Sequence, residues 1–246
     1  MYKLDHKYTP TSVSSVFGPS LIKKLATKLI PRNMILSVVL IESFLTTFLI
    51  DVLHIPETFI GGSSAVASFA MDQHFEEKVR DPDLDIFTTQ PHRTRSMVYS
   101  FLLDNSSPFG IDDVTITNLT KWSEYVRNEL SIWRITVSMP DHQSEINIDI
   151  IYVKSPPFKN NMVKLDYVIR NFDMPIVECI MTYNDATADY EFLHTERMAD
   201  CLGTRMMHLF RKSMPTTERS KEREMKYCRY FDIDIFDISC GFMRIE

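Results

Sequence analysis

Runs of alternating apolar and polar residues predict several short strands in this chain. Residues 83–87 read Asp-Leu-Asp-Ile-Phe, and residues 131–139 and 145–153 alternate similarly on either side of the turn Pro140-Asp141-His142-Gln143. Successive strand residues point to opposite faces of a sheet, so each run places its apolar residues on one face. Two such runs joined by a short turn are typical of a β-hairpin. We expect strands at residues 58–60, 83–87, 131–139, 145–153, 176–183 and 231–238.

Apolar residues that recur every three to four positions predict helices between these strands. The helices cover residues 20–29, 35–53, 63–80, 94–104, 160–172, 190–212 and 216–230, and the rest of the first thirty residues is a loosely structured lead-in. Strands and helices mixed without strict alternation predict an α+β fold, with a mixed β-sheet core, helices packed on it and a helical C-terminal part. One compact unit then comprises an N-terminal helical lead-in (1–55), the core (56–185), and C-terminal helices with a terminal strand (186–246).

The apolar stretch at residues 35–53 is about as long as a membrane-spanning helix. Glu42 lies near its middle, and an acid at that depth in a bilayer is costly, so we expect a buried core helix and no membrane span. The four cysteines include no CxxC pair, which argues against a zinc site and a disulfide framework. The polar start of the chain differs from a signal peptide, so we expect an intracellular, cytoplasmic protein.

The charge of the chain is unevenly distributed. The formal net charge is −6, yet residues 205–229 hold eight Lys or Arg against three Glu, a local balance of +5 that leaves −11 on the rest. A protein that coats nucleic acid is usually basic overall. A basic segment in an acidic body instead favours local recognition of an anion.

Three aspartates lie on predicted strands among apolar neighbours, and they are the main candidates for catalysis. Asp83 and Asp85 are two residues apart, so both point to one face of their strand, and Asp149 has the same apolar flanks in Ile148-Asp149-Ile150. Carboxylate oxygens are the ligands of Mg²⁺ or Mn²⁺. Two such ions can stabilise the negative charge that develops when a hydroxyl attacks a nucleoside triphosphate.

A glycine turn precedes the first two aspartates. Gly61, Gly62 and Ser63 follow the strand at residues 58–60 and open the helix at residues 63–80. Such a turn lets backbone N–H groups approach a triphosphate beside a helix N-terminus, and Ser63 adds a hydroxyl. A strand-borne Asp-x-Asp can also be the solvated side of an edge strand. We interpret the alternation Phe231-Asp-Ile-Asp-Ile-Phe-Asp237 in that way, as a half-buried terminal strand without a preceding glycine turn.

Together these motifs resemble the nucleotidyltransferase superfamily, which includes DNA polymerase β, poly(A) polymerases and small antitoxin-type transferases. The matching segments are Phe59-Ile-Gly-Gly-Ser63, Asp83-Leu-Asp-Ile-Phe87 and Ile148-Asp-Ile150. More narrowly, Asn171-Phe172-Asp173 and Lys226-Tyr227-Cys-Arg-Tyr-Phe231 are similar to segments of uncharacterised transferase-like proteins of large DNA viruses. The resemblance implies a nucleotidyltransferase-like core, an NTP substrate, and Mg²⁺ (or Mn²⁺) held by Asp83, Asp85 and Asp149.

The charged helix at residues 216–230 allows two interpretations. Its Lys and Arg residues alternate with Glu218, Glu222 and Glu224 at helical spacing, as on a solvated helix face. Alternatively, some of them contact the triphosphate or the acceptor, and the candidates are Arg219, Arg223 and Lys226.

The sequence therefore favours transfer of a nucleoside monophosphate from an NTP to a hydroxyl acceptor, which is RNA, a protein or a small molecule. A catalytically inactive nucleotidyltransferase-like module that binds a nucleotide or a protein is the alternative. A purely structural protein with solvated acids is a third. The sequence leaves the base, the acceptor and the oligomeric state open.

Overall fold

The computed structural model describes residues 8–12, 48, 51–69, 83–104, 113–119, 130–138, 145–153, 168–169, 172–184, 186, 189–209 and 218–237. The described strands are β1 (Tyr8–Ser12), β2 (Thr58–Gly61), β3 (Asp83–Thr88), β4 (Asp113–Asn118), β5 (Leu130–Ser138), β6 (Glu145–Val153), β7 (Cys179–Asn184), β8 (Asp189–Thr195), β9 (Met206–Leu209) and β10 (Asp234–Asp237). The helices are α3 (Ser63–Phe69), α5 (Pro91–Asp104), α8 (Glu196–Thr204), α9 (Glu218–Phe231) and a 3₁₀ turn, η2 (Pro175–Val177).

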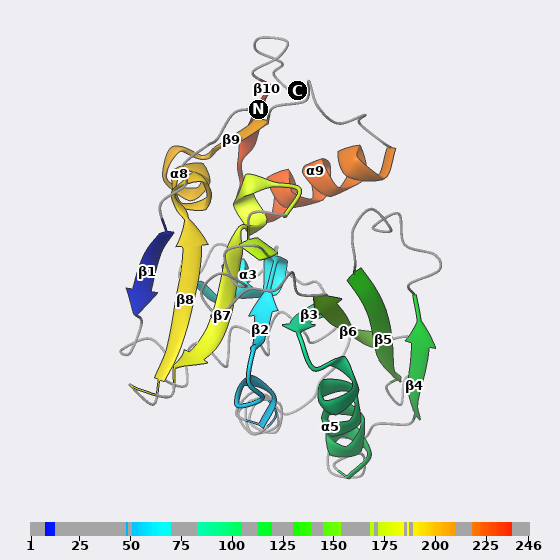
Figure 1. Ribbon diagram of the computed structural model, residues 1–246. Coiled ribbons are helices and arrows are strands. Elements are labelled where there is room, and N and C mark those ends of the chain that lie inside the picture. Colours follow the sequence, from blue (N-terminus) through cyan, green and yellow to red (C-terminus); the bar gives the residue numbers. More distant parts are fainter. Residues whose placement is uncertain are drawn as a thin grey trace, which may run out of the picture.

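Eight of these strands form one mixed sheet, in the order β1-β8-β7-β2-β3-β6-β5-β4 (Figure 1). Strands β3 and β6 are parallel, and the other described neighbours in this sheet are antiparallel. Helices α5 and α9 lie near opposite ends of the strands, α5 at the bottom and α9 at the top of the view (Figure 1). This arrangement confirms the predicted α+β fold with a mixed sheet and helices packed on it.

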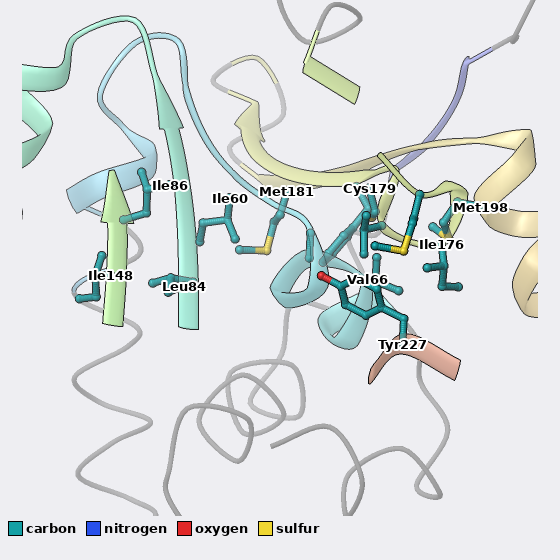
Figure 2. Packing of buried hydrophobic residues seen from close by; sticks show 14 of the residues in the cluster. Ile60, Val66, Leu84, Ile86, Ile148, Ile176, Cys179, Met181, Met198 and Tyr227 are labelled. Atoms are coloured by element: carbon teal, nitrogen blue, oxygen red, sulfur yellow. The ribbon is translucent and has the colours of Figure 1, made fainter. Parts of the chain in front are cut away.

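The two faces of the sheet have different compositions because the strand residues alternate. One face carries the main core, in which Leu84, Ile86, Ile148 and Ile150 pack with residues of α3 and α5 (Figure 2). Each such side chain contributes about 1.5–3 kcal/mol to folding when it is fully buried. The other face holds a smaller cluster, which includes Phe59, Phe87, Ile132 and Ile151. On that second face the aspartates of β3 and β6 lie beside the smaller cluster.

Four strand predictions are confirmed with small shifts in their bounds. Strands β2 and β3 match the runs at residues 58–60 and 83–87, and β5 and β6 pair antiparallel as the hairpin pattern predicts. The strand predicted at residues 176–183 begins only at Cys179, because Pro175–Val177 forms a 3₁₀ turn first. The helix predicted at residues 94–104 already begins at Pro91, a residue well suited to the first helical position.

The long helix predicted at residues 190–212 is wrong. The segment forms strand β8, helix α8 and strand β9 instead. Residues 192–195 are all buried, so the strand lacks the alternation that would have revealed it. The Thr195 hydroxyl then accepts a hydrogen bond from the Met198 N–H at 3.2 Å and caps α8, and Arg205 adopts a left-handed φ of 56° after the helix.

Two edge strands of the main sheet were also not predicted. Strand β1 lies in the segment expected to be a loosely structured lead-in, where it pairs antiparallel with β8. Strand β4 buries only Val114 among its six residues, so it has almost no apolar face to recognise. An edge strand with such a pattern is defined by backbone pairing to its neighbour rather than by burial.

The C-terminal part contains strands as well as helices. Strands β9 and β10 form a separate two-stranded parallel sheet that connects the ends of α8 and α9. Strand β10 confirms a terminal strand within residues 231–238, and Asp232 and Asp234 are exposed there, as the interpretation of a half-buried strand expects. The helix prediction for residues 216–230 is confirmed by α9.

Several predictions concern segments outside the described residues. This group comprises the helix predicted at residues 20–29, most of the helices predicted at 35–53 and 160–172, and residues 70–80 of the helix predicted at 63–80. Where the structure describes the chain, no helix is both long and apolar enough to cross a membrane.

A buried carboxylate joins the 3₁₀ turn to α8. Glu178 is 2 % exposed, accepts a hydrogen bond from the Thr195 hydroxyl at 2.5 Å, and forms an ion pair with Arg197 at 3.2 Å. Burial raises the pKa of Glu178, while the charge of Arg197 and the Thr195 hydrogen bond oppose that rise. The buried charge is therefore only partly compensated.

Glu178→Gln is expected to remove a pH-dependent loss of stability. Because the pKa of Glu178 is raised in the folded state, the protonated side chain stabilises the fold fully at a pH below 4.5, the usual pKa of a glutamate. This contribution is lost as the pH rises through the higher folded-state pKa. The difference in unfolding free energy, variant minus wild type, should increase with pH in denaturant titrations between pH 4 and pH 8. Glu222→Gln, an exposed acid of α9, should show no such increase. Parallel profiles for the two variants would contradict the assignment.

Candidate functional site

The glycine turn between β2 and α3 has a defined geometry. Gly62 adopts a φ of +70°, and its carbonyl accepts the first helical hydrogen bond, from the Val66 N–H at 3.1 Å. The Gly62 N–H donates to the Cys179 carbonyl of β7 at 3.1 Å. This N–H is therefore engaged within the fold. Ser64 donates from its hydroxyl to the Asp83 carbonyl at 2.9 Å, which ties the start of α3 to the start of β3.

Both glycines are needed because other side chains occupy the space of a Cβ atom. A Cβ at Gly61 would lie 2.7 Å from the Phe87 ring and 3.0 Å from the Phe172 ring. A Cβ at Gly62 would lie 3.2 Å from Oδ2 of Asp85. The turn predicted from Gly61-Gly62-Ser63 thus packs directly against the carboxylate of Asp85. Ser63 itself is buried, at 6 % exposure.

The strand register brings the three predicted aspartates onto one sheet face. Asp85 lies opposite Gly61 of β2 on one side and opposite Asp149 of β6 on the other. Asp83 precedes Asp85 by two residues and lies opposite Asn147. Neighbouring strands are about 4.8 Å apart, so Asp85 and Asp149 are adjacent across the parallel pair. All three carboxyl-bearing side chains are intermediate in exposure, neither fully buried nor fully solvated.

Arg134 of β5 is a site residue that the sequence interpretation missed. It lies opposite Asp149, and its Nε and Nη2 donate to the two carboxylate oxygens at 2.7 and 2.8 Å. The hydrogen bond to Asp149 raises the pKa of Arg134 against the effect of burial, and the charges of Asp149, Asp83 and Asp85 raise it further. The guanidinium therefore lies within the field of all three carboxylates.

The sequence did contain a signal for this pair. Arg134 and Asp149 lie the same number of residues from the centre of the predicted turn, Pro140-Asp141-His142-Gln143. Residues equidistant from the centre of a hairpin turn pair across the strands and share a face. The hairpin prediction therefore already implied that Arg134 faces Asp149.

Helix α9 brings part of the basic segment to the same region. Arg223 forms an ion pair with Asp173, which follows Phe172, and its guanidinium lies 5.8 Å from the Tyr227 ring. Lys226 lies 6.0 Å from the Tyr227 ring and 5.5 Å from that of Tyr230. Packing of α9 on the glycine-turn helix is visible at Tyr227, which lies beside Val66 of α3 (Figure 2).

Tyr227 links α9 electrostatically to the aspartates. Burial raises the pKa of the Tyr227 phenol, and the negative charge of Asp85 adds to that rise. The rise is opposed by the positive charges of Arg223 and Lys226 and by a hydrogen bond from Arg223. The charges of Arg223, Lys226 and Asp85 therefore all act on one phenol. Among the other candidates, the side chain of Arg219 lies outside the described residues.

The remaining cations of α9 support the solvated interpretation for part of the helix. Lys221 is exposed and lies 3.9 Å from Glu218, one turn earlier, and Arg229 is exposed as well. Such exposed pairs contribute about 0–1 kcal/mol to stability. The basic face of α9 therefore divides into a solvated part and a part, formed by Arg223 and Lys226, that packs around Tyr227.

The side-chain arrangement does not yet form a metal centre. In the ranges that the structure describes, no three acidic, histidine or cysteine side chains converge closely enough to hold a metal ion. The donor types, their negative charge and their register suit a divalent cation, but the Arg134 guanidinium holds both oxygens of Asp149. The thiols of Cys179, Cys201 and Cys228 are free, and burial raises the pKa of Cys201 to about 11.

Comparison with known proteins identifies the class of fold. No protein-family model matches the sequence, and no curated protein matches it. Among solved structures, the apo form of a CCA-adding enzyme superposes with a TM-score of 0.50 at 13% sequence identity, covering 94% of this chain and 44% of that one. The chain thus has a fold similar to that of this CCA-adding enzyme, and it spans less than half of that enzyme's length.

Gly62→Ala is expected to destabilise the protein by about 1–2 kcal/mol, because the left-handed φ strains any residue with a Cβ. The added methyl group would also press on the Asp85 carboxylate. Gly203→Ala is a matched control, since Gly203 lies in α8 and a Cβ there meets nothing within 4 Å. The control should gain up to about 1 kcal/mol. Chemical denaturation measures both, and equal stability of the two variants would refute the strained turn.

Proposed function

We propose that this protein transfers a nucleoside monophosphate from an NTP to a hydroxyl acceptor. The observation that carries the proposal is the position of Asp85, which lies between the Gly62 turn and Asp149 on one sheet face. The fold likeness to a CCA-adding enzyme, a member of the nucleotidyltransferase superfamily, supports the same class of reaction. Asp83, Asp85 and Asp149 are the proposed catalytic carboxylates.

The chemistry requires positive charge close to these carboxylates. The α-phosphate attacked by the acceptor hydroxyl and the departing pyrophosphate are both anionic, and three aspartates alone would repel them. Mg²⁺ or Mn²⁺ held by Asp83, Asp85 and Asp149 would supply that charge when bound. The acceptor, whether RNA, a protein or a small molecule, would present its hydroxyl to the α-phosphate on this face of the sheet.

The chain's own cations support binding of the triphosphate. Arg223 and Lys226 lie around Tyr227, and the charges of both cations and of Asp85 act on that phenol. The turn formed by Gly61, Gly62 and Ser63 lies on the other side of Asp85, whose carboxylate packs against Gly62. We propose that the triphosphate lies between this turn and the Arg223–Lys226 part of α9, with Arg219 as a further candidate contact.

A nucleotide-binding module without turnover is the second candidate. The specific observation in its favour is the two-pronged ion pair, the Arg134 fork, in which Nε and Nη2 of Arg134 donate to both oxygens of Asp149. Incubation of the full chain with α-labelled NTPs, Mg²⁺ or Mn²⁺, and RNA, protein or small-molecule acceptors distinguishes the two. Label in a product supports the enzyme, whereas saturable binding without product supports the module.

Asp85→Asn is expected to abolish transfer while leaving the fold intact, because the substitution removes one charge with almost no change in shape. Asp234→Asn is the matched control, since Asp234 belongs to the exposed Asp-x-Asp pattern near the C-terminus. The control should retain wild-type transfer. Transfer rates and thermal unfolding are measured for both variants, and an Asp85→Asn protein as active as wild type would end the catalytic assignment.

Lys226→Gln is expected to raise the KM for the NTP by roughly three- to tenfold, since a charged contact to phosphate is worth about 1 kcal/mol at a half-exposed position. Its effect on kcat should be smaller. Lys221→Gln makes the same change in net charge on the solvated part of α9 and should leave KM unaltered. An equal rise in both variants would indicate a general charge effect instead of a specific contact.

A further inference from the structure

The ion pair between Arg134 and Asp149 is geometrically well defined. Two N–H groups of one guanidinium meet the two oxygens of one carboxylate at 2.7 and 2.8 Å, on residues directly opposite each other in the β5–β6 ladder. Such a two-pronged, charge-assisted contact is among the stronger polar interactions in proteins. The Asp149 side chain is 14% exposed and that of Arg134 is 32% exposed. The carboxylate thus has limited access to water, and the guanidinium covers it.

This pair competes with the proposed role of Asp149. Nucleotidyl transfer, as proposed above, needs Asp149 to share a divalent cation with Asp83 and Asp85. In the described part of the chain these side chains do not converge into a metal-binding group. A cation at the Asp149 oxygens would also lie against the positive guanidinium, and like charges at that distance repel. A metal ion and the Arg134 guanidinium therefore compete for the Asp149 carboxylate.

We propose that Arg134 is a cationic placeholder, which occupies Asp149 until a divalent cation displaces it and which thereby sets the metal affinity of the site. This inference rests on the proposed function. Arg134 acts on the metal through Asp149, so it is a positioning residue. The resting pair compensates the charge of Asp149 through two hydrogen bonds from one guanidinium. Metal binding then has to overcome a preformed ion pair.

Binding of Mn²⁺ alone to the full-length protein tests this role, with free Mn²⁺ measured by electron paramagnetic resonance and no nucleotide present. Arg134→Gln removes the competing charge and is expected to tighten Mn²⁺ binding by about tenfold or more, the equivalent of one charged hydrogen bond. Arg134→Lys keeps the charge but cannot span both oxygens, so its affinity should rise less. Lys221→Gln changes net charge equally at a distant, exposed position and should match wild type.

Asp85→Asn and Asp149→Asn identify where the ion binds, because each should weaken Mn²⁺ binding. If Arg134→Gln and Arg134→Lys bind Mn²⁺ as wild type does while both asparagine variants bind it more weakly, the placeholder role is overturned and the proposed function stands. If Mn²⁺ binding is absent from wild type and both Arg134 variants, or indifferent to Asp85→Asn, both proposals fail. Thermal unfolding establishes that each variant is folded. If Arg134→Gln does not fold, the Mn²⁺ affinity of Arg134→Lys compared with wild type tests the placeholder role.

Discussion

Repulsion among the carboxylates is the constraint on which the site depends. Asp83, Asp85 and Asp149 share one face of two neighbouring parallel strands, where the spacing between strands is about 4.8 Å. Negative charges this close, in partly buried positions, require positive charge nearby. Arg134 supplies it at Asp149, from the strand that pairs with β6 in the hairpin. Arg223 and Lys226 of α9 lie around Tyr227, on whose phenol the charge of Asp85 also acts.

The glycine turn determines where Asp85 can lie. Because Gly61 has no Cβ, the rings of Phe87 and Phe172 can pack against it. Because Gly62 has no Cβ, the Asp85 carboxylate can lie beside it. The Phe87 and Phe172 rings meet edge to face with centroids 5.5 Å apart, and Asp173 next to Phe172 forms the ion pair with Arg223 of α9. Segments around residues 61, 172 and 223 are thus connected through successive contacts. The aromatic contacts and the ion pair couple the shape of the turn to the position of the basic helix.

The sequence predicted the elements that carry clear alternation. Asp83 to Phe87 alternates because one side faces the main core, and the hairpin pattern was equally explicit, so the aspartates could be placed on one face from the sequence. Strand β8 was not recognisable, because residues 192–195 are all buried and so lack the alternation of a half-exposed strand. Strand β4 was missed for the opposite reason, since almost none of it is buried. The association of α9 with Asp173 depends on tertiary packing, which local patterns do not encode.

The central claim is that the three aspartates receive a divalent cation and an NTP between the glycine turn and α9. A crystal structure of the full chain with Mn²⁺ and a non-hydrolysable NTP analogue tests it most directly, because Mn²⁺ gives an anomalous signal. The account predicts Mn²⁺ bound by Asp83, Asp85 and Asp149, Arg134 withdrawn from Asp149, and the triphosphate directed toward Arg223 and Lys226. Mn²⁺ bound elsewhere, or a nucleotide away from this face with the Arg134–Asp149 pair intact, would contradict it.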